Sequence, residues 1–341
     1  MVNLSSWFHS RSFIHSQFAD LAALGARKRE RGLTVTVVLP TLNVAETIGP
    51  IVETVAGLNR RQPLVDQLLV VDARSTDGTP QIAAKHGAEV HMEDELLPEC
   101  GPPIGKGDAM WRALSVVRGE IVMYADADTL QFAPHFIYGV LGPLIEDESV
   151  EFVKAGYRRP FGNGESALED GGGRVTELTL KPLFNLFYPE LAGFVQPLAG
   201  EFAATSSLLK SLPFFTGYAA ETGIIVDVYE RCGLDAMAQV DIGVRHNRHQ
   251  SLQELGVMAY SVLRALARRL IEEGRLNLEH APGSPESLAQ LDEFIQAVAG
   301  ERGFELRSTV IDIVERPAFK RLSREPLHHQ RRETVRLPSP N

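Results

Sequence analysis

At 341 residues, with 44% hydrophobic and 23% charged residues, the chain has the size and balance of a globular enzyme built on one large α/β domain, with or without an appendage. The net charge of −10 argues against a nucleic-acid-binding protein, but it does not exclude phosphate-bearing small molecules, whose sites need only local cations. The two cysteines, Cys100 and Cys232, form no C-x-x-C motif and no disulfide framework, so we expect a reducing, cytoplasmic location.

Strands and helices alternate through the first 130 residues. β-branched and apolar runs predict four strands, and stretches with apolar residues at helical spacing follow the first three. The expected strands are 34–40, 67–72, 88–92 and 120–125, and the expected helices are 45–58, 79–86 and 105–117. This alternation predicts a Rossmann-like, mostly parallel sheet with helices on both faces, whose ligands bind at the carboxyl ends of the strands. Leu42, Asp72 and Asp126 all fall just past such strand ends.

The second half of the chain is less regular. We expect strands at 151–160 and 234–244, helical spacing after the glycine run 171–173, and a short helix at 220–233. Two amphipathic helices, 251–273 and 286–299, should follow, and the basic tail beyond Pro317 has the composition of an exposed arm. The predicted fold class is therefore α/β, with a mixed second half and C-terminal helices.

Asp126-Ala127-Asp128, at the end of an apolar strand, is the strongest single feature. Such a strand places two carboxylates at a solvent-accessible edge of the sheet, with the apolar core behind them. Mg²⁺ and Mn²⁺ take oxygen ligands and share them with substrate phosphates, so the pair predicts a divalent-cation site. A capped turn is the competing interpretation, because D-x-D is short and common.

Asp72 also ends a strand, and turn-forming residues follow it. A carboxylate at this place can accept hydrogen bonds from a base or a ribose. We therefore assign Asp72 to a nucleotide contact and Asp77 to a helix cap. Turn chemistry alone explains the same residues equally well.

Two cations follow glycines at the start of predicted helices. Glycines let a backbone approach closely and helix N-termini favour anions, so Lys106 is a candidate phosphate contact, although its spacing is not that of a Walker A motif. The run Gly171–Gly173 leads into Arg174 and Thr176, whose guanidinium and hydroxyl groups suit a phosphate or a carboxylate. This second run predicts a separate anion site, with a flexible hinge as the alternative.

Histidines and arginines gather after the strand at 234–244. A neutral imidazole of His246 or His249 could complete a metal shell with Asp128, although surface histidines are usually only solvated. Glu221, at the start of a helix, could orient an acceptor hydroxyl or act as a base. Favourable charge at a helix N-terminus explains Glu221 nearly as well.

Eight motifs stand in order along the chain: VVLPTLN, VVDARSTDGT, GKGDAMWRAL, YADADT, GGGRVTEL, QPLAGEFA, GYAAETG and GVRHNRHQSLQELG. The first four resemble the nucleotide-sugar half of glycosyltransferases with the GT-A fold. The whole series, from about Val35 to Gly256, resembles the retaining synthases that make glucosyl- or mannosyl-3-phosphoglycerate from a nucleotide sugar. GGGRVTEL and GKGxAxWRxL are far more specific than D-x-D.

We expect five regions: an N-terminal extension (1–33), a nucleotide-sugar-binding half (34–130), an acceptor-binding half (131–250), a C-terminal helical region (251–316) and an exposed tail (317–341). The resemblance implies a role for each matching residue. The donor-binding residues would be Pro40, Thr41, Leu42, Asp72, Lys106, Asp126 and Asp128. Gly173, Arg174 and Thr176 would bind the phosphate and carboxylate of 3-phosphoglycerate. Asp128, Glu221 and Arg245 would be catalytic, and Asp128 and His246 would hold Mg²⁺ or Mn²⁺.

Three departures from the family pattern matter. Enzymes that use UDP-glucose typically read LNE and DSGSTD after the first two strands, where this chain has Leu42-Asn43-Val44 and Asp72-Ala73-Arg74-Ser75-Thr76-Asp77. A small Ala73 beside Arg74 would admit or contact a larger base, which favours a GDP-sugar. The family's metal histidine falls where this chain has Asn247, so His246 is the expected ligand and His249 the alternative.

We therefore expect transfer of mannose, with glucose as a second candidate sugar, from a GDP-sugar to the 2-hydroxyl of D-3-phosphoglycerate, giving a compatible-solute precursor. The amphipathic C-terminal pattern and the resemblance suggest a homodimer. The alternatives are a UDP-glucose-dependent glucosyl-3-phosphoglycerate synthase, a polyprenyl-phosphate glycosyltransferase and a non-catalytic sugar-nucleotide sensor. No signal peptide and no membrane span is expected, since the N-terminus lacks an uninterrupted apolar core and arginines break the most apolar later stretch.

Overall fold

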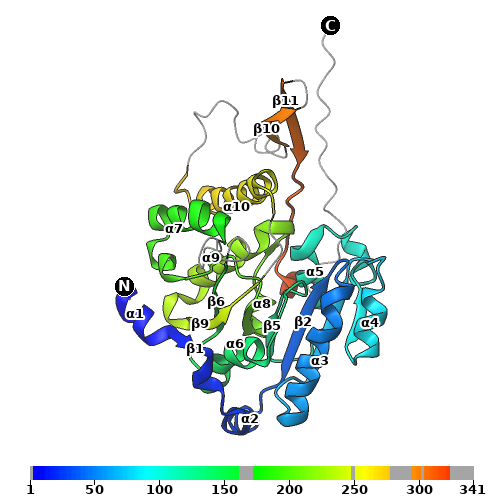
Figure 1. The fold of residues 1–341 in the computed structure, drawn as a ribbon. Helices are drawn as coiled ribbons and strands as arrows, with labels where there is room; N and C mark the ends of the chain where they lie inside the picture. The colour runs from blue at the N-terminus through cyan, green and yellow to red at the C-terminus, as the bar shows by residue number, and fades with distance from the viewer. Residues whose placement is uncertain (1–2, 161–171, 247–249, 277–292, 301–302, 323–341) are drawn as a thin grey trace.

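An eight-stranded sheet runs through the centre of the protein in our computed structural model, which describes residues 3–160, 172–246, 250–276, 293–300 and 303–322. The strand order is β1-β9-β6-β7-β5-β2-β3-β4, and only β7 runs antiparallel to its neighbours. The predicted mostly parallel α/β sheet is confirmed (Figure 1). The strands are β1 (Ser12–Ile14), β2 (Val35–Thr41), β3 (Gln67–Asp72), β4 (Glu89–Met92), β5 (Ile121–Tyr124), β6 (Phe152–Arg158), β7 (Phe202–Thr205) and β9 (Met237–Val244).

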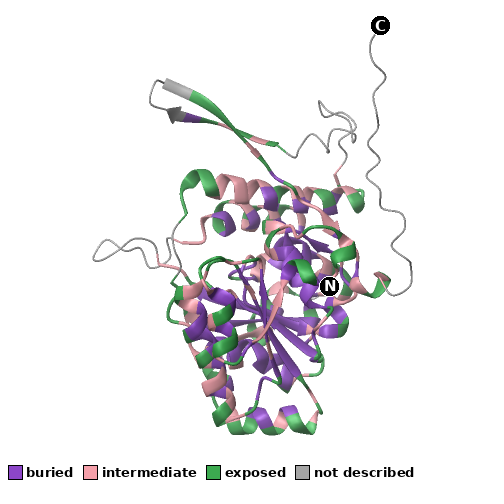
Figure 2. Cartoon of the chain, turned by 90° about the vertical axis from the view of Figure 1, so that its right-hand side faces the viewer, coloured by how far each residue is buried: buried purple, intermediate pink, exposed green. Residues whose placement is uncertain are grey.

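Helices cover both faces of this sheet because alternate strand residues point to opposite sides. In β2, Val37 and Leu39 belong to the apolar core on one face and Val38 to the core on the other. Figure 2 shows the strands as the buried centre between the helical layers. On the face of Val37 lie α2 (Leu21–Glu30), α3 (Ala45–Arg61), α4 (Thr79–Lys85) and α6 (Pro134–Glu146). On the other face lie α1 (Leu4–Arg11), α5 (Gly105–Ala113), α7 (Lys181–Phe187), α8 (Ser206–Leu209), α9 (Ala220–Cys232) and α10 (Leu252–Glu272).

The N-terminal residues are part of this body. Trp7 of α1 is 1% exposed, and its indole Nε1 donates a hydrogen bond to the Met237 carbonyl at 2.8 Å. β1 then adds a parallel strand at the edge of the sheet beside β9. No helix in the described ranges is long and apolar enough to cross a membrane.

The predicted helix at 286–299 is wrong where the structure describes it. Residues 293–300 form strand β10 (Glu293–Gly300), which pairs with β11 (Gly303–Val310) in an antiparallel hairpin that projects from the body (Figure 1). Residues 286–292 lie outside the described ranges. Pairing with a second segment outweighs the local helical spacing here, so the C-terminal region holds one long helix and a hairpin.

After the hairpin the chain crosses back over the body. Strand β12 (Glu315–Arg316) pairs with β8 (Phe214–Phe215), and a short helix, α11 (Phe319–Leu322), follows. The Arg316 guanidinium donates to both carboxylate oxygens of Asp108 in α5, at 2.8 and 2.7 Å. This buried ion pair ties the C-terminal segment to the helix that carries Lys106. The exposed arm predicted beyond Pro317 therefore begins with an ordered turn, and its part beyond residue 322 lies outside the described ranges.

Candidate active site

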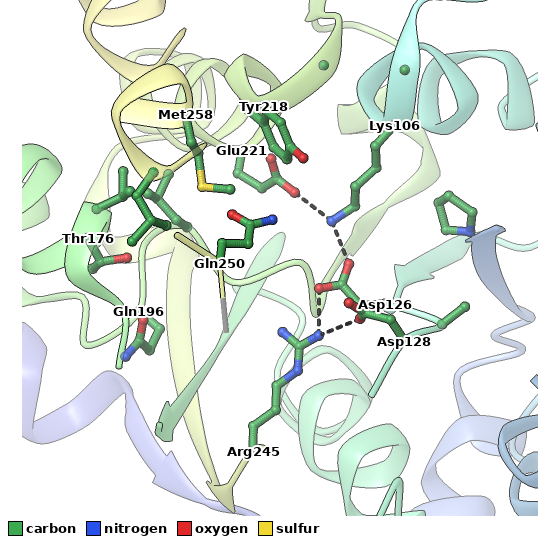
Figure 3. A pocket seen from close by; sticks show the side chains of 18 of the residues that line it. Lys106, Asp126, Asp128, Thr176, Gln196, Tyr218, Glu221, Arg245, Gln250 and Met258 are labelled. Carbon is green, nitrogen blue, oxygen red and sulfur yellow. Dashed lines mark hydrogen bonds and ion pairs between the residues drawn. The ribbon is translucent and has the colours of Figure 1, made fainter. Parts of the chain in front are cut away.

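Most of the predicted site residues meet at the carboxyl edge of the sheet, around one cavity of about 580 Å³. The strand ends of β2, β5 and β9 supply part of its lining, and the first turns of α5 and α9 supply another part. In Figure 3, Thr176, Gln196 and Met258 lie across this cavity from Lys106 and Asp126. The predicted residues that line it are Pro40, Thr41, Leu42, Lys106, Asp126, Asp128, Gly173, Arg174, Thr176, Glu221 and Arg245.

Asp126 is held between two cations. Lys106 Nζ donates to Asp126 Oδ1 at 2.5 Å and to Glu221 Oε1 at 2.8 Å, and Arg245 Nη2 donates to Asp126 Oδ2 at 2.7 Å (Figure 3). Burial opposes the charge on Asp126, but Lys106 and Arg245 outweigh it and hold the pKa of Asp126 below its ordinary value. Burial likewise opposes the charge on Lys106, and the two carboxylates outweigh it and raise the pKa of Lys106. The four side chains therefore form one network of ion pairs.

Arg245 anchors the other side of this network from the end of β9. It is 3% exposed, and its Nη1 donates to the Tyr157 hydroxyl and to Glu201 Oε2, both at 3.0 Å. Burial raises the pKa of Glu201, while the charge of Arg245 opposes that rise. Glu201 and Tyr157 were not predicted as site residues, although Glu201 falls within the motif QPLAGEFA.

Asp128 is the open carboxylate of the pair. Its side chain is 61% exposed, and its ion-pair partner in the described chain, Arg245, lies 3.4 Å away. An exposed carboxylate beside an anionic neighbour fits the oxygen ligands that Mg²⁺ and Mn²⁺ prefer. Asp126, by contrast, has both carboxylate oxygens engaged by cations.

His246, the predicted companion of Asp128, has a different environment. His246 is exposed and does not line the cavity, and its carbonyl accepts a hydrogen bond from the Leu130 amide at 3.3 Å. His249 lies outside the described residues. Among the residues that the structure describes, no group of three or more His, Cys, Asp or Glu side chains is gathered to hold a metal. The protein ligands beyond Asp128 stay a prediction.

Two glycines allow the close contacts of the site. A Cβ at Gly107 would lie 2.3 Å from the Phe215 carbonyl oxygen, and one at Gly200 would lie 2.2 Å from Asp126 Oδ1. Both distances are too short for any side chain, so only glycine fits. The first glycine lets α5 approach the segment that leads to Glu221, and the second seats the Asp126 carboxylate against the backbone.

The anion site expected after the glycine run lies at the far end of the cavity. Gly173 has a φ of +70°, and the chain then enters a helical turn, Thr176–Leu180, that continues into α7. Arg174 Nη2 donates to the Gln250 carbonyl at 3.0 Å. Arg159, which was not predicted as a site residue, lines the same cavity and adds a second guanidinium. Leu255, Met258 and Val262 of α10 give this end an apolar wall.

Asp72 is placed differently from its predicted role. It is fully buried and does not line the cavity. Its Oδ2 accepts hydrogen bonds from the Thr41 and Ser75 hydroxyls, and its Oδ1 accepts one from the Ser75 amide, all at 2.7 Å. Asp72 thus fixes the loop below the cavity, and both of its carboxylate oxygens are engaged within the protein.

The cap predicted at Asp77 is confirmed. Its Oδ1 accepts hydrogen bonds from the Thr79 amide and hydroxyl, and its Oδ2 accepts one from the Ala45 amide. Thr79 and Ala45 are the first residues of α4 and α3. One carboxylate therefore caps two helices behind the cavity.

Residues 36–168 match the family described as Glycosyl transferase family 2, which assigns the sheet and its aspartate-bearing edge to a glycosyltransferase. Within that class, the chain belongs to the glucosyl-/mannosyl-3-phosphoglycerate synthase family. It is 38% identical to the glucosyl-3-phosphoglycerate synthase of Mycolicibacterium paratuberculosis over 92% of both chains. The crystal structure of mannosyl-3-phosphoglycerate synthase from Rubrobacter xylanophilus is 57% identical, with a TM-score of 0.87 over 93% of this chain and 99% of that one.

A glucosyl-3-phosphoglycerate synthase from Mycobacterium tuberculosis, solved with Mn²⁺, UDP and glucosyl-3-phosphoglycerate, is 36% identical. Its TM-score is 0.74 over 89% of this chain and 95% of that one. The relatives thus include enzymes named for each of the two sugars.

Proposed function

We propose that this chain transfers mannose, with glucose as a second sugar, from a GDP-sugar to the 2-hydroxyl of D-3-phosphoglycerate with retention of the anomeric configuration. The observation that carries the proposal is one cavity that joins the Asp126–Asp128 edge to Gly173, Arg174 and Thr176. The 57% identity to a mannosyl-3-phosphoglycerate synthase, against 38% and 45% to two glucosyl enzymes, supports mannose as the sugar.

The donor half of the cavity suits a nucleoside diphosphate with a divalent cation. Relatives have been solved with Mn²⁺ or Mg²⁺ and UDP, and the exposed Asp128 carboxylate is a suitable ligand, with His246 or His249 as its expected companion. When bound, the cation neutralises charge on the departing diphosphate. Lys106, at the first turn of α5, adds a fixed positive charge on the same side.

The acceptor half suits a small molecule with two anionic groups. Arg174 and Arg159 offer planar guanidinium groups, which bind phosphate and carboxylate with paired hydrogen bonds. Thr176 and the backbone amides near Gly173 add neutral donors. A glycerate that carries one phosphate and one carboxylate meets this set of donors.

The chemistry proceeds on one face of the sugar. The bond from the anomeric carbon to the diphosphate oxygen breaks, the 2-oxygen of the acceptor bonds to the same carbon, and its proton passes to the departing diphosphate. The carboxylates that face the cavity from the charged network, Asp126 and Glu221, are paired to Lys106, which disfavours a covalent glycosyl intermediate on either. Glu221 is instead placed to orient a sugar or acceptor hydroxyl, and Arg245 to fix Asp126 and Asp128.

A donor panel with one acceptor tests this proposal. The purified full chain with Mg²⁺ and 3-phosphoglycerate would be given GDP-mannose, GDP-glucose and UDP-glucose, and the product's anomeric configuration read by NMR. We expect mannosyl-3-phosphoglycerate with retained configuration, and little product when 2-phosphoglycerate, glycerate or a polyprenyl phosphate replaces the acceptor. The absence of a phosphorylated glycoside with every donor would refute it.

A UDP-glucose-dependent glucosyl-3-phosphoglycerate synthase is the second candidate. It is favoured by curated relatives of that name at 38–45% identity. A larger kcat/KM for UDP-glucose than for either GDP-sugar in the same panel would select it.

We further propose a cytoplasmic homodimer whose product serves as a compatible-solute precursor. The β10–β11 hairpin exposes Ile295, Leu306 and Val310, at 58%, 77% and 74% of their surface, as an apolar arm suited to self-association. Light scattering of the full chain tests the dimer, and a monomeric mass at working concentration contradicts it.

A further inference from the structure

Glu93 is a buried carboxylate for which the proposed chemistry gives no role. It follows β4 as the first residue of a short 3-10 turn, Glu93–Glu95, and it lines the active-site cavity while only 2% exposed. No described residue donates a hydrogen bond to its Oε1. A buried polar atom without a partner is costly, so such an atom on a residue that lines a cavity indicates a ligand that supplies the donor.

Charged Asp108 and Arg112 lie near Glu93 but do not line the cavity, and the lining residues at this end are mostly apolar. Pro40, Leu42, Val44 and Ala73 line the same end, and Leu42 is 58% exposed. The Thr41 hydroxyl also lies here, but it donates its hydrogen bond to Asp72. This end of the cavity and the acceptor site lie on opposite sides of Asp126. A donor whose diphosphate lies at Asp128 would therefore extend its base toward Glu93. A flat base would pack against the apolar side chains with its polar edge toward Glu93.

The turn that carries Glu93 is fixed from outside by Arg74. The guanidinium Nε of Arg74 lies 2.9 Å from Asp94 Oδ1, and its Nη2 lies 2.9 Å from Glu95 Oε1. Arg74 itself does not line the cavity. The expectation that Arg74 could contact the base is therefore replaced by a different arrangement: Ala73 leaves space in the cavity, and Arg74 holds the turn that presents Glu93 to it.

Burial raises the pKa of Glu93 to about 7, with nearby Asp108 adding to the rise and Arg112 opposing it. A ligand with N–H donors would stabilise the carboxylate form.

We propose that Glu93 selects the donor base by accepting hydrogen bonds from N1–H and the 2-amino group of guanine. The inference rests on the proposed function, in which the donor is a GDP-sugar. Guanine presents two adjacent N–H donors, which match the two oxygens of a carboxylate. Uracil presents one N–H between two carbonyl oxygens that repel a carboxylate, and adenine presents a ring-nitrogen acceptor at the corresponding place.

Binding of free nucleotides to the full chain with Mg²⁺, measured by calorimetry, tests the assignment. The probes are GDP, IDP, XDP and UDP. IDP lacks the 2-amino group, and XDP carries an oxygen in its place. We expect wild type to bind GDP about 10- to 100-fold more tightly than IDP or UDP, the range of one hydrogen bond to a charged group.

The variant Glu93→Gln should bring GDP and IDP to similar affinities and strengthen UDP binding, because the neutral amide accepts from the uracil N–H and donates to a neighbouring carbonyl oxygen. It should also strengthen XDP binding, because its amide can donate to the 2-oxo group and accept from N1–H. Glu99→Gln, an exposed neighbour outside the cavity, is the control with the same charge change and should leave all four affinities as in wild type.

Equal weakening of all four nucleotides in Glu93→Gln would overturn the proposal, as it would indicate a structural or ribose-binding role. Equal GDP and IDP binding by wild type would overturn it even if the variant failed to fold, and so would tighter binding of UDP than GDP. These measurements need no turnover. A chain that selects GDP through Glu93 but makes no product from 3-phosphoglycerate would refute the proposed function and leave the base assignment standing.

Discussion

Lys106 Nζ lies 2.5 Å from Asp126 Oδ1, and the same ammonium group reaches Glu221 at 2.8 Å. One cation therefore holds together a carboxylate at the end of β5 and another at the start of α9. Arg245 neutralises the opposite oxygen of Asp126. The site is thus a charge network in which the loss of Lys106 would leave Asp126 paired with Arg245 alone and would remove the ion-pair partner of Glu221.

Replacing Lys106 by Ala should lower kcat/KM by about 100- to 1,000-fold, the range seen when one preorganised charge-stabilising group is removed. The loss leaves two carboxylates facing an anionic donor. Steady-state kinetics measures the effect, with Lys85→Ala, an exposed lysine of α4, as the control. Unchanged kinetics in Lys106→Ala would contradict the role of this network in the reaction.

Asp128→Ala should abolish measurable turnover while leaving thermal stability close to that of wild type, because its side chain is 61% exposed. Removing divalent cations with EDTA should have the same effect, reversed by excess Mg²⁺ or Mn²⁺ in wild type only. Asp235→Ala, at an exposed aspartate of the same chain, should behave as wild type. Full activity in EDTA would exclude the metal role assigned to Asp128.

Local patterns predicted the donor side of the fold closely. The strand ending at Asp72 has the expected bounds, and that beginning near Val35 is shifted by one residue, because β-branched runs closed by turn residues are local signals. The hairpin at 293–310 was missed because its stability depends on pairing between two segments, while the first of them has helical spacing by itself.

The residues of the site were predicted, but the ion pairs between them were not. Sequence placed Lys106, Asp126, Glu221 and Arg245 at element ends, yet nothing local indicates that one lysine bridges two carboxylates. Glu93 stood in an acidic, proline-rich loop with no motif around it. Its burial depends on the packing of α5 and of the C-terminal segment, and neither is visible along the chain.

Arg174→Lys should raise the KM for 3-phosphoglycerate by about 10- to 100-fold, because an ammonium group cannot replace the paired donors of a guanidinium. The affinity for the nucleotide should stay as in wild type, since Arg174 lies at the acceptor end of the cavity. Arg159→Ala should act in the same direction, whereas Arg158→Ala, at an exposed arginine outside the cavity, should not. If Arg158→Ala raised the KM for 3-phosphoglycerate as much as Arg159→Ala, the effect would be one of surface charge in general.

Lys154→Met should change stability in a pH-dependent way. Lys154 lies on β6 with no exposed surface, its Nζ has no hydrogen-bond partner among the described residues, and it sits 4.7 Å from the centre of the Phe202 ring. Burial lowers the pKa of Lys154 from 10.5 to about 8, with Glu221 opposing the shift. Between these two values the unfolded chain binds more protons than the folded one, so Lys154 makes wild-type stability rise with pH over that range.

Methionine removes the buried charge at similar size. Below pH 8 the variant should therefore be more stable than wild type by up to about 3 kcal/mol, since one pKa unit corresponds to about 1.4 kcal/mol. The difference should shrink as the pH approaches 10.5. Urea denaturation at pH 7 and pH 10 measures it, with Lys85→Met as the exposed control. A difference that stays constant with pH would mean that Lys154 keeps its ordinary pKa in the folded protein, held there by the neighbouring carboxylates.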